Sequence, residues 1–216
     1  MKKYLMSAAV VALLIGTTTQ VNAQKGLNVS VKVTPQFSSL QNADDKDNKA
    51  IDKETTFRTN IGAGVGYNFT DNVGVGIDVL YSLQGQKMNV ILLGDVDQKL
   101  GYVKVPLYLS YSSDVSNAVG LYGKIGPQLS FLSKSEATTN GKTIENKDKY
   151  QSTTFGMMAN VGAQFRLIDN LSLQTGIYFD TDFTNAEDED YIFYPNNRAN
   201  TYNMNVGLQI GLKYQF

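Results

Sequence analysis

Charged residues that alternate with apolar ones are the part of this chain best placed for chemistry. Nine of them fall on the polar side of two-residue repeats: Lys32, Arg58, Asp78, Lys104, Lys124, Arg166, Asp180, Asp182 and Lys213. Facing one another, they would form either a polar path through the protein or a plug of ion pairs. The plug is favoured. We expect Asp78 to pair with Lys32, Lys104 or Lys124, because a buried charge without a partner costs several kcal/mol.

The charges do not complete a catalytic arrangement. The chain has no histidine, which removes the commonest general base and the partner that a catalytic serine needs. Asp180 and Asp182 with Arg198, or the acidic run 187–190, could supply carboxylates for acid–base work or calcium. The spacing of the acidic run matches no calcium loop and is typical of a solvated loop. The sequence therefore predicts no enzyme, no catalytic residue, no cofactor and no metal site.

Extended strands must position these charges. The last stretch, residues 201–216, alternates without a fault: Tyr202, Met204, Val206, Leu208, Ile210, Leu212, Tyr214 and Phe216 share one side. Seven earlier segments repeat the pattern, at about residues 27–34, 57–69, 73–84, 102–111, 119–131, 154–167 and 171–183, with Leu80 as a misfit. The fold class predicted is all-β: an eight-stranded antiparallel up-and-down transmembrane β-barrel.

The lengths of the connections support the same architecture. Short turns at 70–72, 112–117 and 168–170 alternate with long polar loops at 39–54, 87–97, 133–149 and 185–198. Outer-membrane barrels have short turns on the periplasmic side and long loops outside. We therefore expect four external loops and both termini on the periplasmic side.

A soluble lipocalin-like barrel that binds an apolar ligand would show the same alternation with the apolar face turned inward. The apolar face here carries essentially no charge, and aromatic residues gather near strand ends. Lysine or arginine facing lipid at mid-depth costs about 2–4 kcal/mol, so this pattern favours the membrane barrel. At the outer interface we expect aromatic anchors: Phe57, Tyr81, Phe183, Tyr191, Phe193 and Tyr194.

The amino-terminal segment has the features of a secretory signal peptide. Lys2 and Lys3 precede a short apolar run, and small residues end at Ala23, after which we expect cleavage. The run is shorter than the roughly 20 residues of a membrane-spanning helix. The predicted domains are a signal peptide at 1–23 and a barrel at 24–216. Zero cysteine and a formal charge of −1 indicate no disulfide framework and no nucleic-acid surface.

Two prolines fall inside predicted strands. Pro106 and Pro127 lie nearly opposite each other when residues are counted from the turn between their strands. Proline removes a ladder donor, and a closed barrel has no edge to hide it. We expect a bulge or a locally opened ladder there, either as plain geometry, which is favoured, or as a lateral opening for a lipid or partner.

The same two strands carry a family resemblance. The stretch 102–109, Tyr-Val-Lys-Val-Pro-Leu-Tyr-Leu, and the stretch 120–129, which contains Gly126-Pro127, resemble the paired strands of Bacteroidetes-type outer-membrane β-barrel proteins of the porin-family or PorT-like kind. The resemblance implies an eight-stranded barrel in outer-membrane lipid of a Gram-negative bacterium. It also implies folding by the barrel-assembly machinery, which reads an aromatic carboxy-terminal residue such as Phe216. It implies no single activity.

An eight-stranded barrel is just wide enough to be filled by side chains. We therefore expect a structural or surface-interaction protein of the cell envelope that acts through its four long loops, with a surface or secretion partner. Narrow-lumen transport of ions or small solutes is the alternative.

Overall fold

The computed structural model describes residues 25–46, 51–90, 94–113, 118–192, 194–195 and 197–216. The predicted signal peptide at 1–23 lies outside these residues. Within these residues there are eight long strands: β1 (Gly26–Gln41), β3 (Thr56–Asn68), β4 (Val73–Val90), β5 (Gly94–Ser112), β6 (Val119–Thr139), β8 (Thr153–Ile168), β9 (Leu171–Asp182) and β10 (Tyr202–Gln215). Four short elements accompany them: α2 (Ala43–Lys46), β2 (Ile51–Glu54), β7 (Lys142–Glu145) and a 3₁₀ turn, η1 (Lys147–Lys149).

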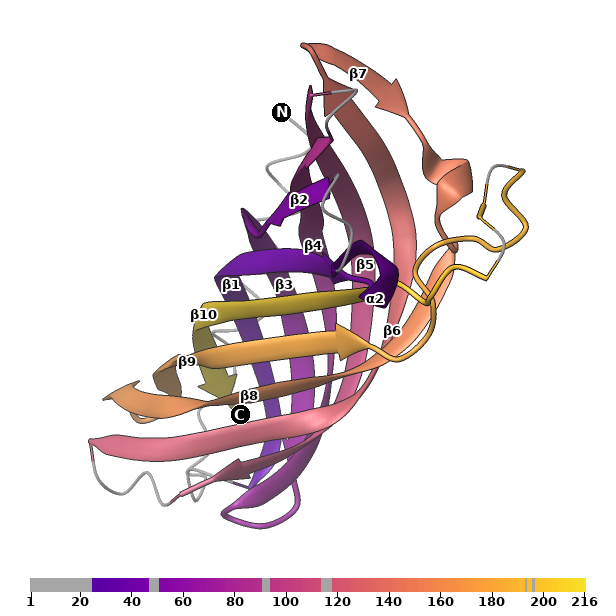
Figure 1. Ribbon diagram of the computed structural model, residues 1–216. Helices are drawn as coiled ribbons and strands as arrows, with labels where there is room; N and C mark the ends of the chain where they lie inside the picture. Colours follow the sequence, from indigo (N-terminus) through magenta and orange to yellow (C-terminus); the bar gives the residue numbers. More distant parts are fainter. Residues whose placement is uncertain (1–24, 47–50, 91–93, 114–117, 193, 196) are drawn as a thin grey trace, which may run out of the picture.

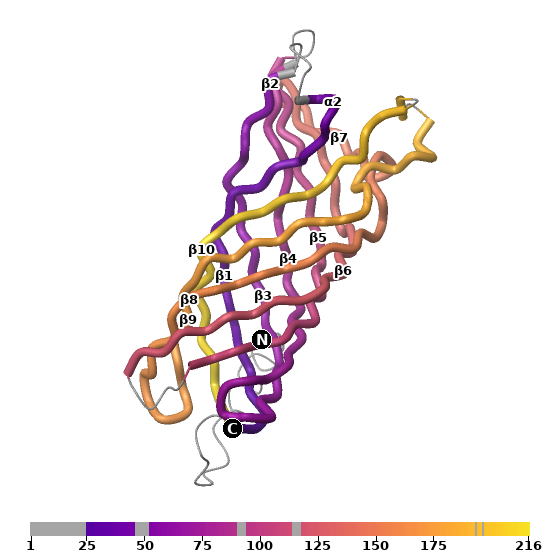
Figure 2. Tube along the Cα trace, turned by 60° about the horizontal axis from the view of Figure 1, so that its bottom comes forward, coloured from indigo at the N-terminus to yellow at the C-terminus, as the bar shows by residue number. Residues whose placement is uncertain are grey.

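The eight long strands close into an antiparallel barrel (Figures 1 and 2). Their order is β4-β3-β1-β10-β9-β8-β6-β5, and β5 pairs back to β4. The first and last strands are neighbours, joined from Asn28 opposite Gln215 to Gln41 opposite Tyr202. The all-β barrel predicted from the sequence is confirmed. Within the described ranges, no helix is long and apolar enough to cross a membrane.

The barrel is apolar outside and polar inside. Leu121 and Val161, for example, are 66% and 64% exposed on the outer wall, whereas Asn205 and Asp180 are fully buried on the inner wall. This orientation suits a wall that faces lipid and rules out the lipocalin-like alternative, which needs apolar side chains inside. Leu80 is an exception to the pattern of residue types, because it is an apolar residue whose side chain points inward and is buried.

Short turns and long connections lie at opposite ends of the barrel. In the turn between β3 and β4, the hydroxyl of Thr70 accepts hydrogen bonds from the backbone N–H groups of Asn72 and Val73, at 3.2 and 2.8 Å. The carboxy terminus lies at the end opposite β2 and β7 (Figures 1 and 2). We refer to these as the short-turn end and the long-loop end.

At the long-loop end, three strands continue past the apolar belt. β4, β5 and β6 have 18, 19 and 21 residues, and their outer parts pair through residues such as Lys87 opposite Asp97 and Asp97 opposite Thr138. We call residues 85–90, 94–100 and 133–139, together with the edge strands β2 and β7, the projecting sheet (Figure 1).

The projecting sheet corrects the prediction that 87–97 and 133–149 are irregular loops. The segment 39–54 also contains the end of β1, α2 and β2. The sequence pattern missed these strands because a strand outside the bilayer needs no apolar face, so its alternation fades while its backbone pairing continues.

The two strand prolines interrupt the ladder where they lie. Between β5 and β6, pairing runs to Pro106 opposite Gln128 and resumes at Leu109 opposite Ile125. The skipped stretch contains Pro127, as the missing N–H of proline predicts. A corresponding gap in the β4–β5 ladder lies beside Pro106. The expected local opening of the ladder is therefore present.

Candidate functional site

The first ion pair of the lumen joins strands that are not neighbours. Nζ of Lys32 on β1 lies 2.5 Å from Oδ2 of Asp78 on β4, and both residues are buried. Tyr108 donates a hydrogen bond to the other carboxylate oxygen at 3.0 Å. Glycines make room for this group: a Cβ at Gly64 would collide with Oδ1 of Asp78, and one at Gly76 would lie 2.6 Å from the Tyr108 ring. Asp78 thus has the lysine partner that the sequence predicted.

A second ion pair crosses the lumen from β5 to β9. Nζ of Lys104 lies 2.5 Å from Oδ1 of Asp180, and Asn205 donates to the same oxygen at 2.8 Å. Two residues along β9, Asp182 accepts a hydrogen bond from Asn203 at 2.6 Å. Because β5 and β9 are separated by β6 and β8, this network ties opposite walls of the barrel together.

Lys124 is held by neutral groups. Its Nζ donates to Oε1 of Gln174 at 3.1 Å and lies 5.4 Å from the ring centroids of both Tyr108 and Tyr122. A cation above aromatic faces is stabilised by the negative ring quadrupole. Lysine, amide and aromatic side chains therefore fill this part of the lumen.

Three of the predicted lumen charges lie away from the middle. Arg58 is only partly buried at the long-loop end, where it pairs with Asp97 at 2.5 Å. Arg166 is exposed near the short-turn end, so it is not one of the buried charges of the lumen. Lys213 is half-buried. The inward face continues to the strand ends, where it meets water, and periodicity cannot tell those positions from the centre.

Apolar side chains also cross the lumen, and the sequence analysis missed them. A loop-end layer contains Leu40, Leu100, Tyr102 and Leu132 with Tyr150 packed against it, and a mid-barrel layer contains Tyr108, Met158 and Tyr178. The sequence does carry a signal for them, since Tyr102 and Tyr108 alternate with the outward residues of their strand and therefore fall on the inward side. Aromatic and aliphatic layers of this kind fill a small barrel.

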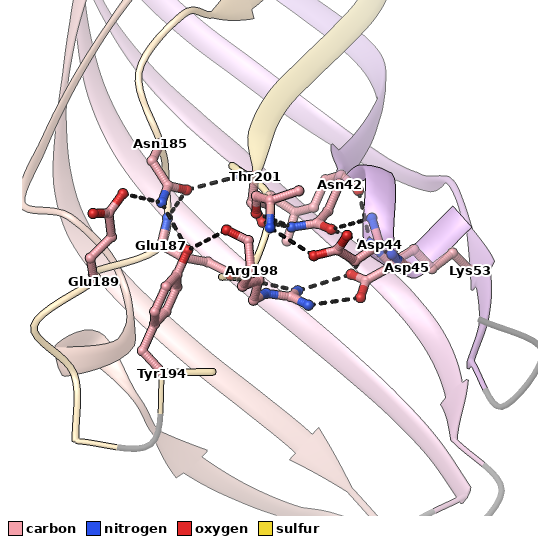
Figure 3. A network of polar contacts seen from close by, with 12 residues as sticks. Asn42, Asp44, Asp45, Lys53, Asn185, Glu187, Glu189, Tyr194, Arg198 and Thr201 are labelled. Atoms are coloured by element: carbon pink, nitrogen blue, oxygen red, sulfur yellow. Dashed lines mark hydrogen bonds and ion pairs between the residues drawn. The ribbon is translucent and has the colours of Figure 1, made fainter. Parts of the chain in front are cut away.

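A second network, here called the loop clamp, joins the first and fourth connections (Figure 3). It consists of Asn42, Asp45, Lys53, Asn185, Glu187, Arg198 and Thr201. Arg198 reaches both oxygens of Asp45 at 2.9 and 3.0 Å and both oxygens of Glu187 at 2.6 and 3.1 Å. Bidentate pairs of this kind fix geometry as well as charge.

The charges of the loop clamp shift one another's ionisation. Hydrogen bonds that Arg198 donates to the carboxylates of Glu187 and Asp45 raise the pKa of Arg198. Burial disfavours the ionised form of Asp45, but hydrogen bonds from Arg198 and Lys53 outweigh it and lower the pKa of that carboxyl. Arg198 and Asp45 are therefore both charged at neutral pH.

The third connection is attached to the clamp as well. Gln151 donates to Asp188 at 3.0 Å, and Tyr150 forms a backbone bridge with Glu187. The acidic run 187–190 is thus not simply a solvated loop. Carboxylates at 187 and 188 hold neighbouring loops together, and Arg198 belongs to this cluster and not to Asp180 or Asp182.

The predicted aromatic anchors divide into two groups. Phe57, Tyr81 and Phe183 are exposed on the outer wall, and Phe183 packs edge-on against Phe155. Tyr194 instead accepts a hydrogen bond from Asn185 of the loop clamp at 3.3 Å. Tyr191 is half-buried beneath Lys149, with Nζ 5.6 Å from the ring centroid. Phe193 lies outside the described residues.

A closed sheet with an apolar outer wall and a charged, filled interior defines an integral outer-membrane barrel. The family model described as "Outer membrane protein beta-barrel domain" matches residues 7–216, and the chain belongs to this family. The match extends into the predicted signal peptide, so cleavage after Ala23 stays a prediction. The family match also supports localisation in the outer membrane.

Solved outer-membrane barrels share the fold. OprG from Pseudomonas aeruginosa is similar with a TM-score of 0.56 at 15% identity, covering 89% of this chain and 97% of that one. Neisserial surface protein A has a TM-score of 0.56 at 14% identity, covering 88% and 97%. A major outer membrane protein from Thermus thermophilus has a TM-score of 0.52 at 15% identity, covering 88% and 99%. A comparison with curated proteins finds no match.

Proposed function

We propose that this outer-membrane barrel is a non-enzymatic surface-interaction protein that binds its partner through the projecting sheet and the loops beside it. The projecting sheet is the observation that carries the proposal. β4, β5 and β6 extend beyond the apolar belt and pair with β2 and β7, so the long-loop end presents an ordered surface. β7 is exposed along its whole length, with Ile144 61% exposed.

The loop clamp supports the same proposal. It joins three connections into one assembly, which lowers the conformational entropy that a partner would otherwise have to remove on binding. An exposed edge strand beside it can accept a partner strand by main-chain pairing.

Photo-crosslinking in living cells tests the interaction. A photoreactive residue at Ile144, which is exposed on β7, is expected to give one discrete adduct with the partner. The same residue at Leu121 on the lipid-facing wall is the control. An identical adduct pattern from both positions, or none from Ile144 in the native host, would contradict the proposal.

Narrow-lumen transport is the second candidate, and the charged inner wall is the observation in its favour. The two lysine–aspartate pairs and the two apolar layers cross the lumen, which opposes free passage. We expect no reproducible single-channel steps in a planar bilayer. Steps that change on charge reversal of Asp78 or Lys104 would favour transport over surface interaction.

Orientation and assembly belong to the same proposal. We place the short-turn end and both termini in the periplasm, with the long-loop end outside, as barrel proteins usually have them. Phe216 is proposed as the signal for the barrel-assembly machinery: its backbone N–H donates to the carbonyl of Leu27, and its ring packs against Tyr214. Removal of Phe216 is expected to slow membrane assembly. A narrower Bacteroidetes-type or PorT-like membership also remains a proposal.

A further inference from the structure

Four residues on the inner wall of the last two strands each carry a buried oxygen without a donor. Asp180 and Asp182 on β9 and Asn203 and Asn205 on β10 are at most 3% exposed. Each has one side-chain oxygen that accepts no hydrogen bond from the described residues: Oδ2 of Asp180, Oδ1 of Asp182, and Oδ1 of both asparagines. Buried polar atoms in proteins normally have a partner, so this group of acceptors calls for one.

The register brings the four residues to one place. Asn205 is directly opposite Asp180 in the antiparallel ladder. Asn203 lies two residues before Asn205 and Asp182 two residues after Asp180, which brings them to the same next level of the ladder. Opposite Cβ atoms are roughly 5 Å apart, and residues two apart on a strand are roughly 7 Å apart. Asn203 donates to Asp182 at 2.6 Å and to Tyr102 at 3.5 Å. Asn205 donates to Asp180 at 2.8 Å and to Gln84 at 3.1 Å. The amide oxygens of both asparagines are left for another group.

The charges around this group do not balance. Lys104 neutralises Asp180 through a contact with Oδ1. Asp182 takes its hydrogen bonds from two neutral groups, the hydroxyl of Thr154 at 3.0 Å and the amide of Asn203. Lys32 is occupied by Asp78 on another part of the wall. Lys104 also attracts the Asp182 carboxylate, so two buried carboxylates share one lysine and the group keeps a net negative charge, which is unfavourable.

We propose that Asp180, Asp182, Asn203 and Asn205 form a binding site for one small monovalent cation of the sodium or potassium class. Carboxylate and amide oxygens are hard ligands that suit such ions, and carbonyl and aspartate oxygens line cation-selective sites in membrane channels. A single positive charge balances Asp182 while Lys104 holds Asp180. A divalent ion would leave an excess positive charge beside the lysine.

The sequence offers Asp180 and Asp182 as candidate carboxylates with Arg198 and predicts no metal site, and it gives no signal for Asn203 and Asn205 as ligands. In the described part of the chain, no three histidine, cysteine, aspartate or glutamate residues are grouped for a metal. The proposal is independent of any surface partner, since it concerns the interior of the barrel.

Thallium(I), which replaces potassium and scatters anomalously, tests the site directly in crystals of the full barrel. We expect one anomalous peak among the four oxygens, absent in the isosteric variant Asp182→Asn. The same site should raise the melting temperature in NaCl or KCl relative to N-methyl-glucamine chloride at equal ionic strength. The expected rise is about 3 °C at a cation concentration ten times the dissociation constant.

Two further variants keep the test decisive. Asp188→Asn removes a carboxylate at the long-loop end and should leave the cation dependence unchanged. Asn205→Asp adds a negative charge at the site and should increase the dependence of the melting temperature on the cation. This variant still tests the site if Asp182→Asn does not fold. Water density without an anomalous peak, or equal melting temperatures in all three salts, would overturn the proposal.

Discussion

The lumen network and the loop clamp are both built from lysine or arginine and aspartate, yet they differ in what holds them. The lysine–aspartate pairs of the lumen are buried between non-adjacent strands, so each side chain depends on its partner. The loop clamp joins connections at the water-facing end, where Arg198 and Glu187 stay partly exposed although Asp45 is buried. Breaking a buried pair leaves a charge that water cannot reach, whereas an exposed pair is replaced by hydration. The lumen therefore governs barrel stability, and the clamp governs the order of the loops.

The largest effect is expected from Lys104→Met, which leaves Asp180 charged and buried. Loss of one partner from a buried pair costs about 3–5 kcal/mol. Urea unfolding in detergent micelles, followed by tyrosine fluorescence because the chain has no tryptophan, measures it. Adding Asp180→Asn should recover much of the loss. If the single and double variants unfold alike, the cross-lumen pair does not carry the stability.

A smaller effect in the same region is expected from Gly64→Ala. The new Cβ would collide with the Asp78 carboxylate and push it from Lys32, at a cost of about 1–3 kcal/mol. Gly123→Ala is the matched control, because its Cβ would point outward with the nearest atom at 3.9 Å. The same unfolding assay compares the two. Equal stability of both variants would mean that the lumen beside Gly64 can accommodate a Cβ without displacing Asp78.

In the loop clamp, Arg198→Gln should loosen the loops with little effect on the barrel. These pairs lie at the water-facing end and connect loops, so their loss should move the unfolding midpoint much less than Lys104→Met does. Hydrogen exchange at residues 184–192 and 42–46 should accelerate, while exchange in β10 stays slow. Arg198→Lys keeps the charge without the bidentate geometry and should give an intermediate result. A large drop in barrel stability would contradict the division between the two regions.

The smallest effect is a pH dependence confined to the clamp. The lowered pKa of Asp45 means that its contribution is fully present above the pKa of an unfolded aspartate, about 3.9, and is lost as the pH falls through the folded value. The protection of the loop amides against hydrogen exchange should therefore fall only in acid. Asp44, Glu187, Lys53 and Arg198 face the same cluster, so Asp45→Asn should reduce the acid response without abolishing it. An unchanged acid response in that variant would show that Asp45 is not responsible.

The sequence predicted the barrel well because the bilayer imposes one strict rule on every spanning strand. A residue such as Val206 must face lipid and its neighbour Asn205 must face inward, so alternation records the fold directly. The same rule placed Asp78 and Lys104 in the lumen. The rule does not apply beyond the membrane boundary. There Lys87 of β4 lies opposite Asp97 of β5 in the ladder, although neither stretch shows an alternation of apolar and polar residues.

The sequence by itself determined the number of spanning strands, their inward and outward faces and the polar character of the lumen, because each depends only on a local repeat of two residues. Tertiary structure alone decided which lysine meets which aspartate, since Lys32 and Asp78, or Lys104 and Asp180, lie on strands that face each other only after the barrel closes. It also decided that Arg198 joins loops from opposite ends of the chain. Such contacts depend on register and closure, which no local pattern encodes.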